Sequence, residues 1–233
     1  MLDKRIVLRL GLFLMVSLLV GCSAGKVSVR ANIPQPLVSK LPLNGYLSYT
    51  DTFKSYQYEE NEKGRSLSSL AFGPAQQEMF DRVFTQLLTV SETNNSSLDV
   101  IIEPEILDLQ YTSPKETKLN LYEVWLRYRV KITDAQNKTL ADWVVKGFGK
   151  TPTATLKSPS SAFNAATNIA LRDVGAQLAI GFPKQPAIAD LLSKKPNYQS
   201  SVSSKPEPAE EPSKELSAEL EAEPAAQTIE QEE

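Results

Sequence analysis

The clearest hydrophobic pattern in the chain lies in residues 121–133, where apolar and polar side chains alternate strictly. Such period-two alternation predicts a β-strand with one buried face and one open face. A turn at 134–138 and a second strand at 139–150 would complete a β-hairpin. The apolar face would carry Tyr122, Val124, Leu126, Tyr128, Val130 and Ile132, and the polar face Glu123, Trp125, Arg127, Arg129 and Lys131.

Shorter aromatic and β-branched stretches predict further strands. They cover residues 45–50, 66–72 and 98–109, with a brief strand at Tyr56 and Tyr58 and another near 27–31. Pro104 interrupts the stretch 98–109 and cannot donate to a ladder, which indicates a bulge or an edge at that point.

Three helices follow from spacing and from start and stop residues. Phe80, Val83, Phe84 and Leu87 share one face of a helix that runs from Pro74 to about Val90. We expect this stripe to be core, with a partner-binding groove as the alternative. A second helix is expected over 160–180, with Ser160 as its N-cap and alanines that approach the sheet closely, and a third over 186–193.

These elements predict an α+β fold, a mostly antiparallel sheet with two main helices packed on one face. The domain is expected over residues 43–193. Residues 1–21 are expected to be a signal peptide, residues 22–42 a lipid-anchored tether, and residues 194–233 a disordered acidic tail. From residue 196 onward large apolar side chains are almost absent, so that segment cannot bury enough surface to offset its ordering entropy.

The first residues have the marks of a secretory signal. Lys4, Arg5 and Arg9 precede the apolar run Leu10–Val20, which is short for a membrane span. The run ends in Leu-Val-Gly-Cys, which resembles the bacterial lipobox, and Cys22 is the only cysteine in the chain. The resemblance implies acylation of Cys22, including palmitate, and a mature chain that begins there. The alternatives are a chance cysteine after an ordinary signal, or an N-terminal anchor helix.

Localisation follows from the same resemblance. Ser23 directly after the cysteine is the outer-membrane pattern of the common enterobacterial scheme, whereas aspartate would signal the inner membrane. We therefore expect an outer-membrane lipoprotein that faces the periplasm.

Charge and composition exclude several functions. Ten glutamates and two lysines give residues 196–233 a net charge of −8, while the body of the chain is mildly basic without a dense basic face. We therefore expect no nucleic-acid binding. With no histidine and its one cysteine assigned to lipid, the chain lacks the usual acid–base, thiol and zinc chemistry. We expect no metal, no cofactor and no enzymatic activity.

Two clusters on predicted strands carry chemistry worth weighing. Asp99, Glu103, Glu105 and Asp108 could serve acid–base work or hold a hard cation, but no motif marks either use, and a solvated sheet face is the better interpretation. Trp125, Arg127 and Arg129 would place an aromatic plate and two guanidinium groups on one face, which suits glycan, phosphate or protein contacts. Cross-strand ion pairs would produce the same pattern for structural reasons. The segment 147–150, Gly-Phe-Gly-Lys, is interpreted as a strand end beside a tight turn.

Residues 98–182 resemble envelope lipoproteins of the YajG type and, more distantly, the auxiliary lipoproteins of envelope ABC transporters. The resemblance is carried by a hydrophobic–Asp–Val–Ile entry into a strand, an aromatic hairpin, and a helix rich in Ala and Asn, here 162–173. It implies an α+β domain and carries no catalytic residues.

The leading hypothesis is a non-enzymatic, membrane-anchored accessory of an envelope transport or assembly complex, with Trp125, Arg127 and Arg129 as partner-binding residues. The alternative is an oligomeric module for lipid or glycan, such as a ring-forming exporter subunit. An apolar cleft between the helix at 74–90 and the sheet, or a homo-oligomer in solution, would favour that alternative. A hydrolase that uses Asp with Ser or Lys is a third hypothesis, which no motif supports.

Overall fold

A computed structural model describes residues 25–34, 36–59, 67–153 and 158–196. Its main sheet has five strands in the order β5-β2-β6-β7-β8. Strand β2 runs parallel to both β5 and β6, whereas β6, β7 and β8 are antiparallel, so the predicted α+β class with a mostly antiparallel sheet is confirmed. The strand bounds are Asn44–Leu47 for β2, Thr89–Val90 for β5, Val100–Thr112 for β6, Leu121–Thr133 for β7 and Thr139–Pro152 for β8.

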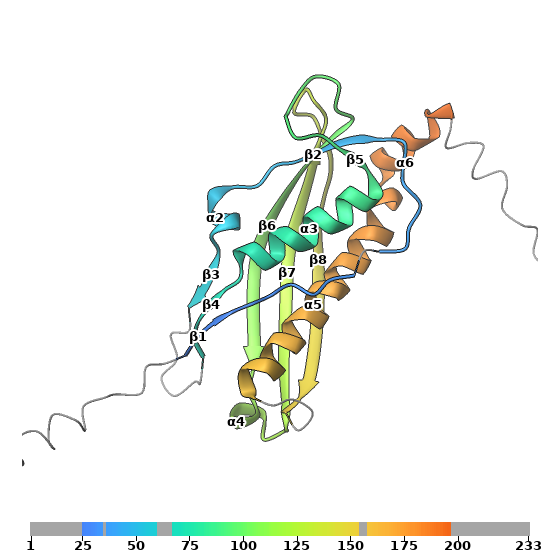
Figure 1. Ribbon diagram of the computed structural model, residues 1–233. Helices are drawn as coiled ribbons and strands as arrows, with labels where there is room; N and C mark the ends of the chain where they lie inside the picture. Colours follow the sequence, from blue (N-terminus) through green and yellow to red (C-terminus); the bar gives the residue numbers. More distant parts are fainter. Residues whose placement is uncertain (1–24, 35, 60–66, 154–157, 197–233) are drawn as a thin grey trace, which may run out of the picture.

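Helices α3 (Gly73–Leu87) and α5 (Pro159–Gly181) lie across one face of this sheet (Figure 1). The predicted stripe on α3 is core, because Phe80, Val83, Phe84 and Leu87 are all buried. The helix ends at Leu87, earlier than Val90, because Thr89 and Val90 form the edge strand β5 beside β2.

Aromatic rings fill the space between α3 and the sheet. Phe53, in the short helix α2 (Asp51–Lys54), contacts Phe80 edge to face at 5.7 Å, and Phe80 contacts Tyr128 of β7 at 5.4 Å. The hydroxyl of Tyr128 donates to Gln76 Oε1 at 3.1 Å, and Gln76 Nε2 donates to the carbonyl of Phe53 at 2.6 Å. Among the described residues, aromatic rings and these hydrogen bonds therefore occupy the space where an apolar cleft would have favoured a lipid-binding module.

Helix α5 approaches strand β8 more closely than any side chain at the contact would allow. A Cβ added to Gly147 would lie 2.4 Å from the carbonyl oxygen of Ala170, and one added to Gly149 would lie 2.0 Å from that of Ala166. The two glycines thus sit in mid-strand under the alanines of α5. The interpretation of residues 147–150 as a strand end beside a turn is wrong, whereas the close approach expected from the alanines is confirmed.

The start of α5 also differs by two residues from the expected one. Ser158, not Ser160, is the N-cap, and its hydroxyl accepts the backbone N–H of Ser161 at 3.2 Å. Pro159 then occupies the first helical position, where its missing N–H costs nothing. After α5 come a 3₁₀ turn, η2 (Phe182–Lys184), and helix α6 (Pro186–Ser193), as predicted.

A second, smaller sheet has the order β1-β4-β3, with β1 at Gly25–Ser28, β4 at Leu67–Ala71 and β3 at Gln57–Glu59. Strand β1 is parallel to β4, and the chain continues from it as an extended strap, residues 29–34 and 36–43, that crosses the helix layer (Figure 1). Val29, Ile33 and Leu41 of the strap are buried in the core.

Side chains of α3 and α5 hold the backbone of the strap. Asn168 donates to the carbonyl of Arg30 at 3.0 Å and accepts the N–H of Asn32 at 2.6 Å. Arg172 and Arg82 donate to the next carbonyls, those of Asn32 and Ile33. The described residues of the segment expected as a tether, 25–34 and 36–42, therefore lie against the folded domain.

Both edges of the main sheet are protected. At β8 the backbone N–H of Phe148 donates to Asp173 Oδ2 at 3.0 Å, and Gln177 Nε2 donates to the carbonyl of Lys146 at 2.6 Å. At the other edge β2 covers only residues 100–102 of β6, and the rest of β6 carries Pro104 and a bulge between Ile106 and Asp108. Prolines, bulges and covering helices are the usual means of blocking strand addition at an edge.

Candidate functional site

The candidate site is the face of the sheet opposite α3 and α5, which none of the described helices covers (Figure 1). The predicted alternation in β7 is confirmed, because Trp125, Arg127, Arg129 and Lys131 are exposed on this face and their neighbours in sequence are buried. The register places rows of three side chains across β6, β7 and β8. From one end the central rows are Gln110–Trp125–Phe148, Asp108–Arg127–Lys146 and Glu105–Arg129–Val144.

Trp125 and Phe148 form an aromatic pair on this open face. They lie opposite each other on β7 and β8, with ring centroids 5.3 Å apart and ring planes 38° from parallel. Trp125 is 39% exposed and Phe148 is 37% exposed, although each ring covers part of the other. Large aromatic side chains with this exposure are typical of contact surfaces, because their burial by a partner removes much apolar area from water.

Arg127 lies in the next row, between Asp108 of β6 and Lys146 of β8. Its neighbour Asp108 accepts a hydrogen bond from Gln110 at 2.8 Å. Within the described ranges, Arg127 has no hydrogen-bond or ion-pair partner. Its guanidinium group is therefore available to a carboxylate, a phosphate or an aromatic ring of a binding partner.

Arg129 has a structural partner instead. Its Nε and one terminal nitrogen donate to the two carboxylate oxygens of Asp142 at 2.8 and 2.6 Å. This bidentate pair raises the pKa of Arg129 and lowers the pKa of Asp142. Lys131 pairs with Glu103 at 3.2 Å in the last row. The ion-pair interpretation therefore applies to Arg129 and not to Arg127, and the predicted trio divides into two parts.

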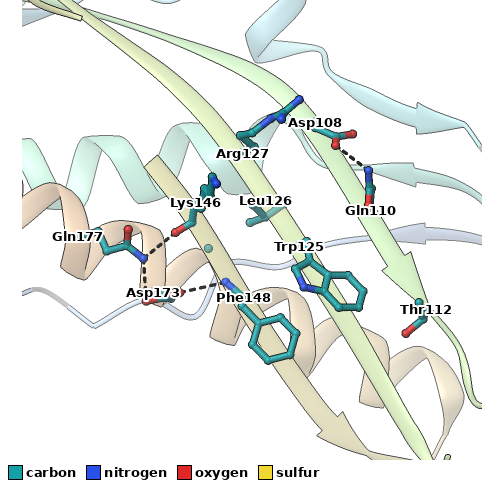
Figure 2. A pocket seen from close by; sticks show the side chains of 11 residues that line it. Asp108, Gln110, Thr112, Trp125, Leu126, Arg127, Lys146, Phe148, Asp173 and Gln177 are labelled. Carbon is teal, nitrogen blue, oxygen red and sulfur yellow. Dashed lines mark hydrogen bonds between the residues drawn. The ribbon is translucent and has the colours of Figure 1, made fainter. Parts of the chain in front are cut away.

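A shallow depression of about 680 Å³ lies over this part of the sheet (Figure 2). We name its centre the platform and define it as Trp125, Phe148, Arg127 and Lys146. Figure 2 shows the two rings side by side, with Arg127 on the next row of β7. Asp173 and Gln177 of α5 border the depression where they hold the backbone of β8. The platform thus offers two apolar ring faces beside two cationic side chains.

The acidic cluster is a set of structural contacts. Asp99 accepts the N–H of Asn44 and pairs with Lys195, both at 2.8 Å. Glu103 and Glu105 share the open face opposite the basic residues of β7, as a solvated sheet face requires. In the described ranges no group of acidic, cysteine or histidine side chains is placed to hold a metal ion.

Sequence reasoning missed Phe148 and Lys146 as members of the site. A signal existed, since pairing β7 with β8 places every side chain of one strand opposite one of the other. The bulge between Ile132 and Thr133 shifts that pairing by one residue, so Trp125 faces Phe148 and not Gly147. A hairpin predicted without this bulge would place Trp125 opposite Gly147, and the Trp125–Phe148 pair would not be recognised.

The predicted lipidation residue, Cys22, lies outside the described residues. Among the helices of the described part, none combines the length and the hydropathy that a membrane span needs.

No protein-family model matches the chain, and no curated protein matches it either. Solved structures do, at low identity. A DUF330 protein from Xanthomonas campestris is 15% identical, with 74% of this chain and 100% of that chain covered and a TM-score of 0.43. Uncharacterized lipoprotein B from Nitrosomonas europaea is 17% identical, with 66% and 92% covered and a TM-score of 0.42. A minor lipoprotein from Acinetobacter baumannii is 11% identical, with 60% and 92% covered and a TM-score of 0.37.

This chain is therefore similar in structure, at low sequence identity, to bacterial lipoproteins. The likeness identifies no functional residue.

Proposed function

We propose that this chain is a lipoprotein of the bacterial envelope, anchored through acyl chains on Cys22, and that its domain is a non-enzymatic accessory of a transport or assembly complex. The platform is its contact surface for a partner protein of that complex. The outer membrane, on its periplasmic side, is the proposed location.

The observation that supports this proposal most is the exposure of the Trp125–Phe148 pair beside Arg127, which has no partner in the described ranges. Aromatic residues and arginine dominate the energetics of protein interfaces. The surrounding rows of paired charges, such as Arg129 with Asp142, provide the polar rim that such interfaces have. The resemblance of residues 98–182 to YajG-type and ABC-transport auxiliary lipoproteins agrees with an accessory role.

A glycan is the second candidate occupant, because a sugar ring stacks on an aromatic face and its hydroxyl groups accept hydrogen bonds from arginine. This would make the chain a binding module, as in the alternative hypothesis. The two occupants require different experiments, since a partner protein forms a crosslink of discrete mass and a glycan does not.

The test is site-specific photocrosslinking in intact cells. Phe148 is replaced by benzoylphenylalanine, which keeps an aromatic ring in the platform. Irradiation should give one or a few discrete adducts, which mass spectrometry identifies as transport or assembly proteins. The same substitution in a Cys22→Ser protein should lose these adducts, because the domain is no longer held at the membrane.

Thr85, which is exposed on α3 on the other side of the molecule, is the control position. A crosslinker there should not give the adducts seen from position 148. If position 148 gives no adduct beyond those of position 85, the platform is not a protein-binding surface. If the adducts persist in the Cys22→Ser protein, anchoring is not needed for the complex.

A further inference from the structure

The folded domain begins almost at the lipid anchor. Strand β1 starts at Gly25, only three residues after Cys22. Three extended residues span at most about 11 Å. If Cys22 carries the acyl chains, as proposed above, the start of β1 is therefore held close to the bilayer surface.

The strap does not lengthen the connection between Cys22 and the folded domain, because its residues are held by the domain. Val29 is buried, and its N–H donates to the carbonyl of Ala71 at 3.2 Å, which continues the pairing of β1 with β4. Asn168 then holds the strap on both sides of Ala31, at Arg30 and Asn32. The domain cannot move away from the membrane without the loss of these buried contacts.

In Figure 1 β1 starts at the side of the sheet, in the half of the molecule that also holds the connection between β6 and β7. A series of contacts leads from β1 to the end of β6. Val27 of β1 pairs with Leu70 of β4, and Leu70 pairs with Tyr58 of β3. Tyr58 contacts the ring of Tyr111 edge to face at 5.8 Å. Tyr111 stands next to the last residue of β6, directly before this connection.

The connection, residues 113–120, is a compact tip built on the short helix α4 (Pro114–Thr117). Ser113 and Glu116 form a capping box, in which the N–H of Ser113 donates to Glu116 Oε2 at 2.7 Å. Lys118 then turns the chain with a φ of 57°. Leu119 follows with 54% of its surface exposed, and Lys115 and Lys118 of the same tip are also exposed.

An exposed leucine in one short tip with two exposed lysines matches the chemistry of a phospholipid surface. The lysines are attracted to anionic headgroups, and the leucine side chain is stabilised at the boundary of the acyl chains. The carboxylate of Glu116, the one acidic group of the tip, is occupied by its capping hydrogen bond.

We propose that this tip, with Leu119 at its centre, lies in the headgroup layer of an anionic phospholipid bilayer, so that the long axis of β7 leads away from the membrane. This inference rests on the proposed acylation of Cys22. It makes the membrane a second contact of the domain, in addition to the acyl chains.

The test uses the full acylated protein in vesicles of phosphatidylethanolamine and phosphatidylglycerol. Since Cys22 is the only cysteine and its sulfur would carry lipid, Leu119→Cys introduces a unique free thiol for the fluorophore NBD. Lipids with spin labels near the headgroup should quench this NBD several-fold more than NBD at Gln136→Cys. Gln136 is exposed in the turn at the opposite end of β7 and serves as the matched control.

A second variant tests the short connection itself. About ten glycine and serine residues inserted after Ala24 add roughly 17 Å of reach. They should reduce the quenching at position 119 and leave flotation of the protein with vesicles unchanged. Circular dichroism checks that each variant is folded.

The outcomes separate the two proposals. If the wild-type protein does not float with vesicles, the proposed anchoring fails. If it floats but positions 119 and 136 are quenched equally, or position 119 is not quenched, the tip does not contact the membrane, and this inference alone is overturned.

Discussion

Phe148 and Asp173 join the two faces of the sheet. The N–H of Phe148 donates to the carboxylate of Asp173 at 3.0 Å, while the ring of Phe148 stacks against Trp125 on the open face. Helix α5, which belongs to the buried layer, therefore fixes the backbone that carries half of the aromatic pair. The backbone beneath this part of the platform is thus held by a helix of the buried layer.

The contact of α5 with β8 predicts a large effect of small substitutions. Gly147→Ala and Gly149→Ala would each place a Cβ within 2.4 Å of a helix carbonyl, so the helix must shift. We expect each to lower the free energy of unfolding by about 1–3 kcal/mol or more. Urea denaturation of the unacylated Cys22→Ser protein measures this.

Gly181→Ala is the matched control for these two variants. It has no atom within 4 Å of the added Cβ, and it lies in the last turn of α5. Its stability should remain within about 1 kcal/mol of the wild type. Equal losses at positions 147 and 181 would contradict the close packing described here.

The division of the predicted trio gives a second prediction. Trp125→Ala and Arg127→Ala should each weaken binding of the partner identified by crosslinking, by about 30-fold if they are central to the interface. Arg129→Ala should have a smaller effect, since its guanidinium is bonded to Asp142. Binding affinities of the three purified variants test this order, and Thr85→Ala serves as control. The reverse order would show that Arg129 exchanges its partner on binding.

The buried hydroxyl of Tyr128 predicts the pH dependence of stability. Burial raises the pKa of Tyr128 well above its ordinary value of 10.0. Above that pH the unfolded chain loses this proton and the folded chain keeps it, so the free energy of unfolding should fall as pH rises. Tyr128→Phe should remove this part of the slope.

At neutral pH the same Tyr128→Phe variant should lose about 1–3 kcal/mol, because Gln76 Oε1 loses its donor in a buried site. Urea titrations of both proteins below and above pH 10 give both quantities. Parallel curves at all pH values would contradict the assignment to Tyr128.

The strap provides a fourth prediction. Asn168→Ala removes two hydrogen bonds to the backbone of residues 30 and 32, in a site where Asn168 is only 9% exposed. We expect faster hydrogen exchange of the amides at 29–33 and a loss of about 1–3 kcal/mol. Ser160→Ala, on an exposed serine near the start of the same helix, should leave those amides unchanged. Uniform exchange in both variants would mean that the strap is not held by Asn168.

Much of the fold was predictable because the patterns were local. The alternation in residues 121–133 predicts β7 residue for residue, and the spacing of Phe80, Val83, Phe84 and Leu87 predicts α3. The packing of the strap on the domain was not predictable. Its buried residues Val29, Ile33 and Leu41 have no regular spacing, and its hydrogen bonds come from α3 and α5. Such distant partners leave no mark on the local sequence.

The candidate site was predictable only in part, for a similar reason. Trp125 and Arg127 follow from the alternation, but the pairing of Trp125 with Phe148 depends on a bulge between Ile132 and Thr133. The difference between Arg127 and Arg129 depends on the carboxylate of Asp142, which lies one row away on β8. The register between β7 and β8 and the choice of ion-pair partner depend on tertiary packing, which the alternation of apolar and polar residues does not reveal.

The protected edges of the main sheet affect how copies of the domain would contact one another if they are held at the same membrane. Acylated proteins share a thin layer at the membrane, where their local concentration is high and collisions between like faces are frequent. Asp173 and Gln177 occupy two backbone groups of β8, the N–H of Phe148 and the carbonyl of Lys146, and Pro104 interrupts the open edge of β6. If the chain is acylated as proposed, these features disfavour strand addition between neighbouring copies at the membrane.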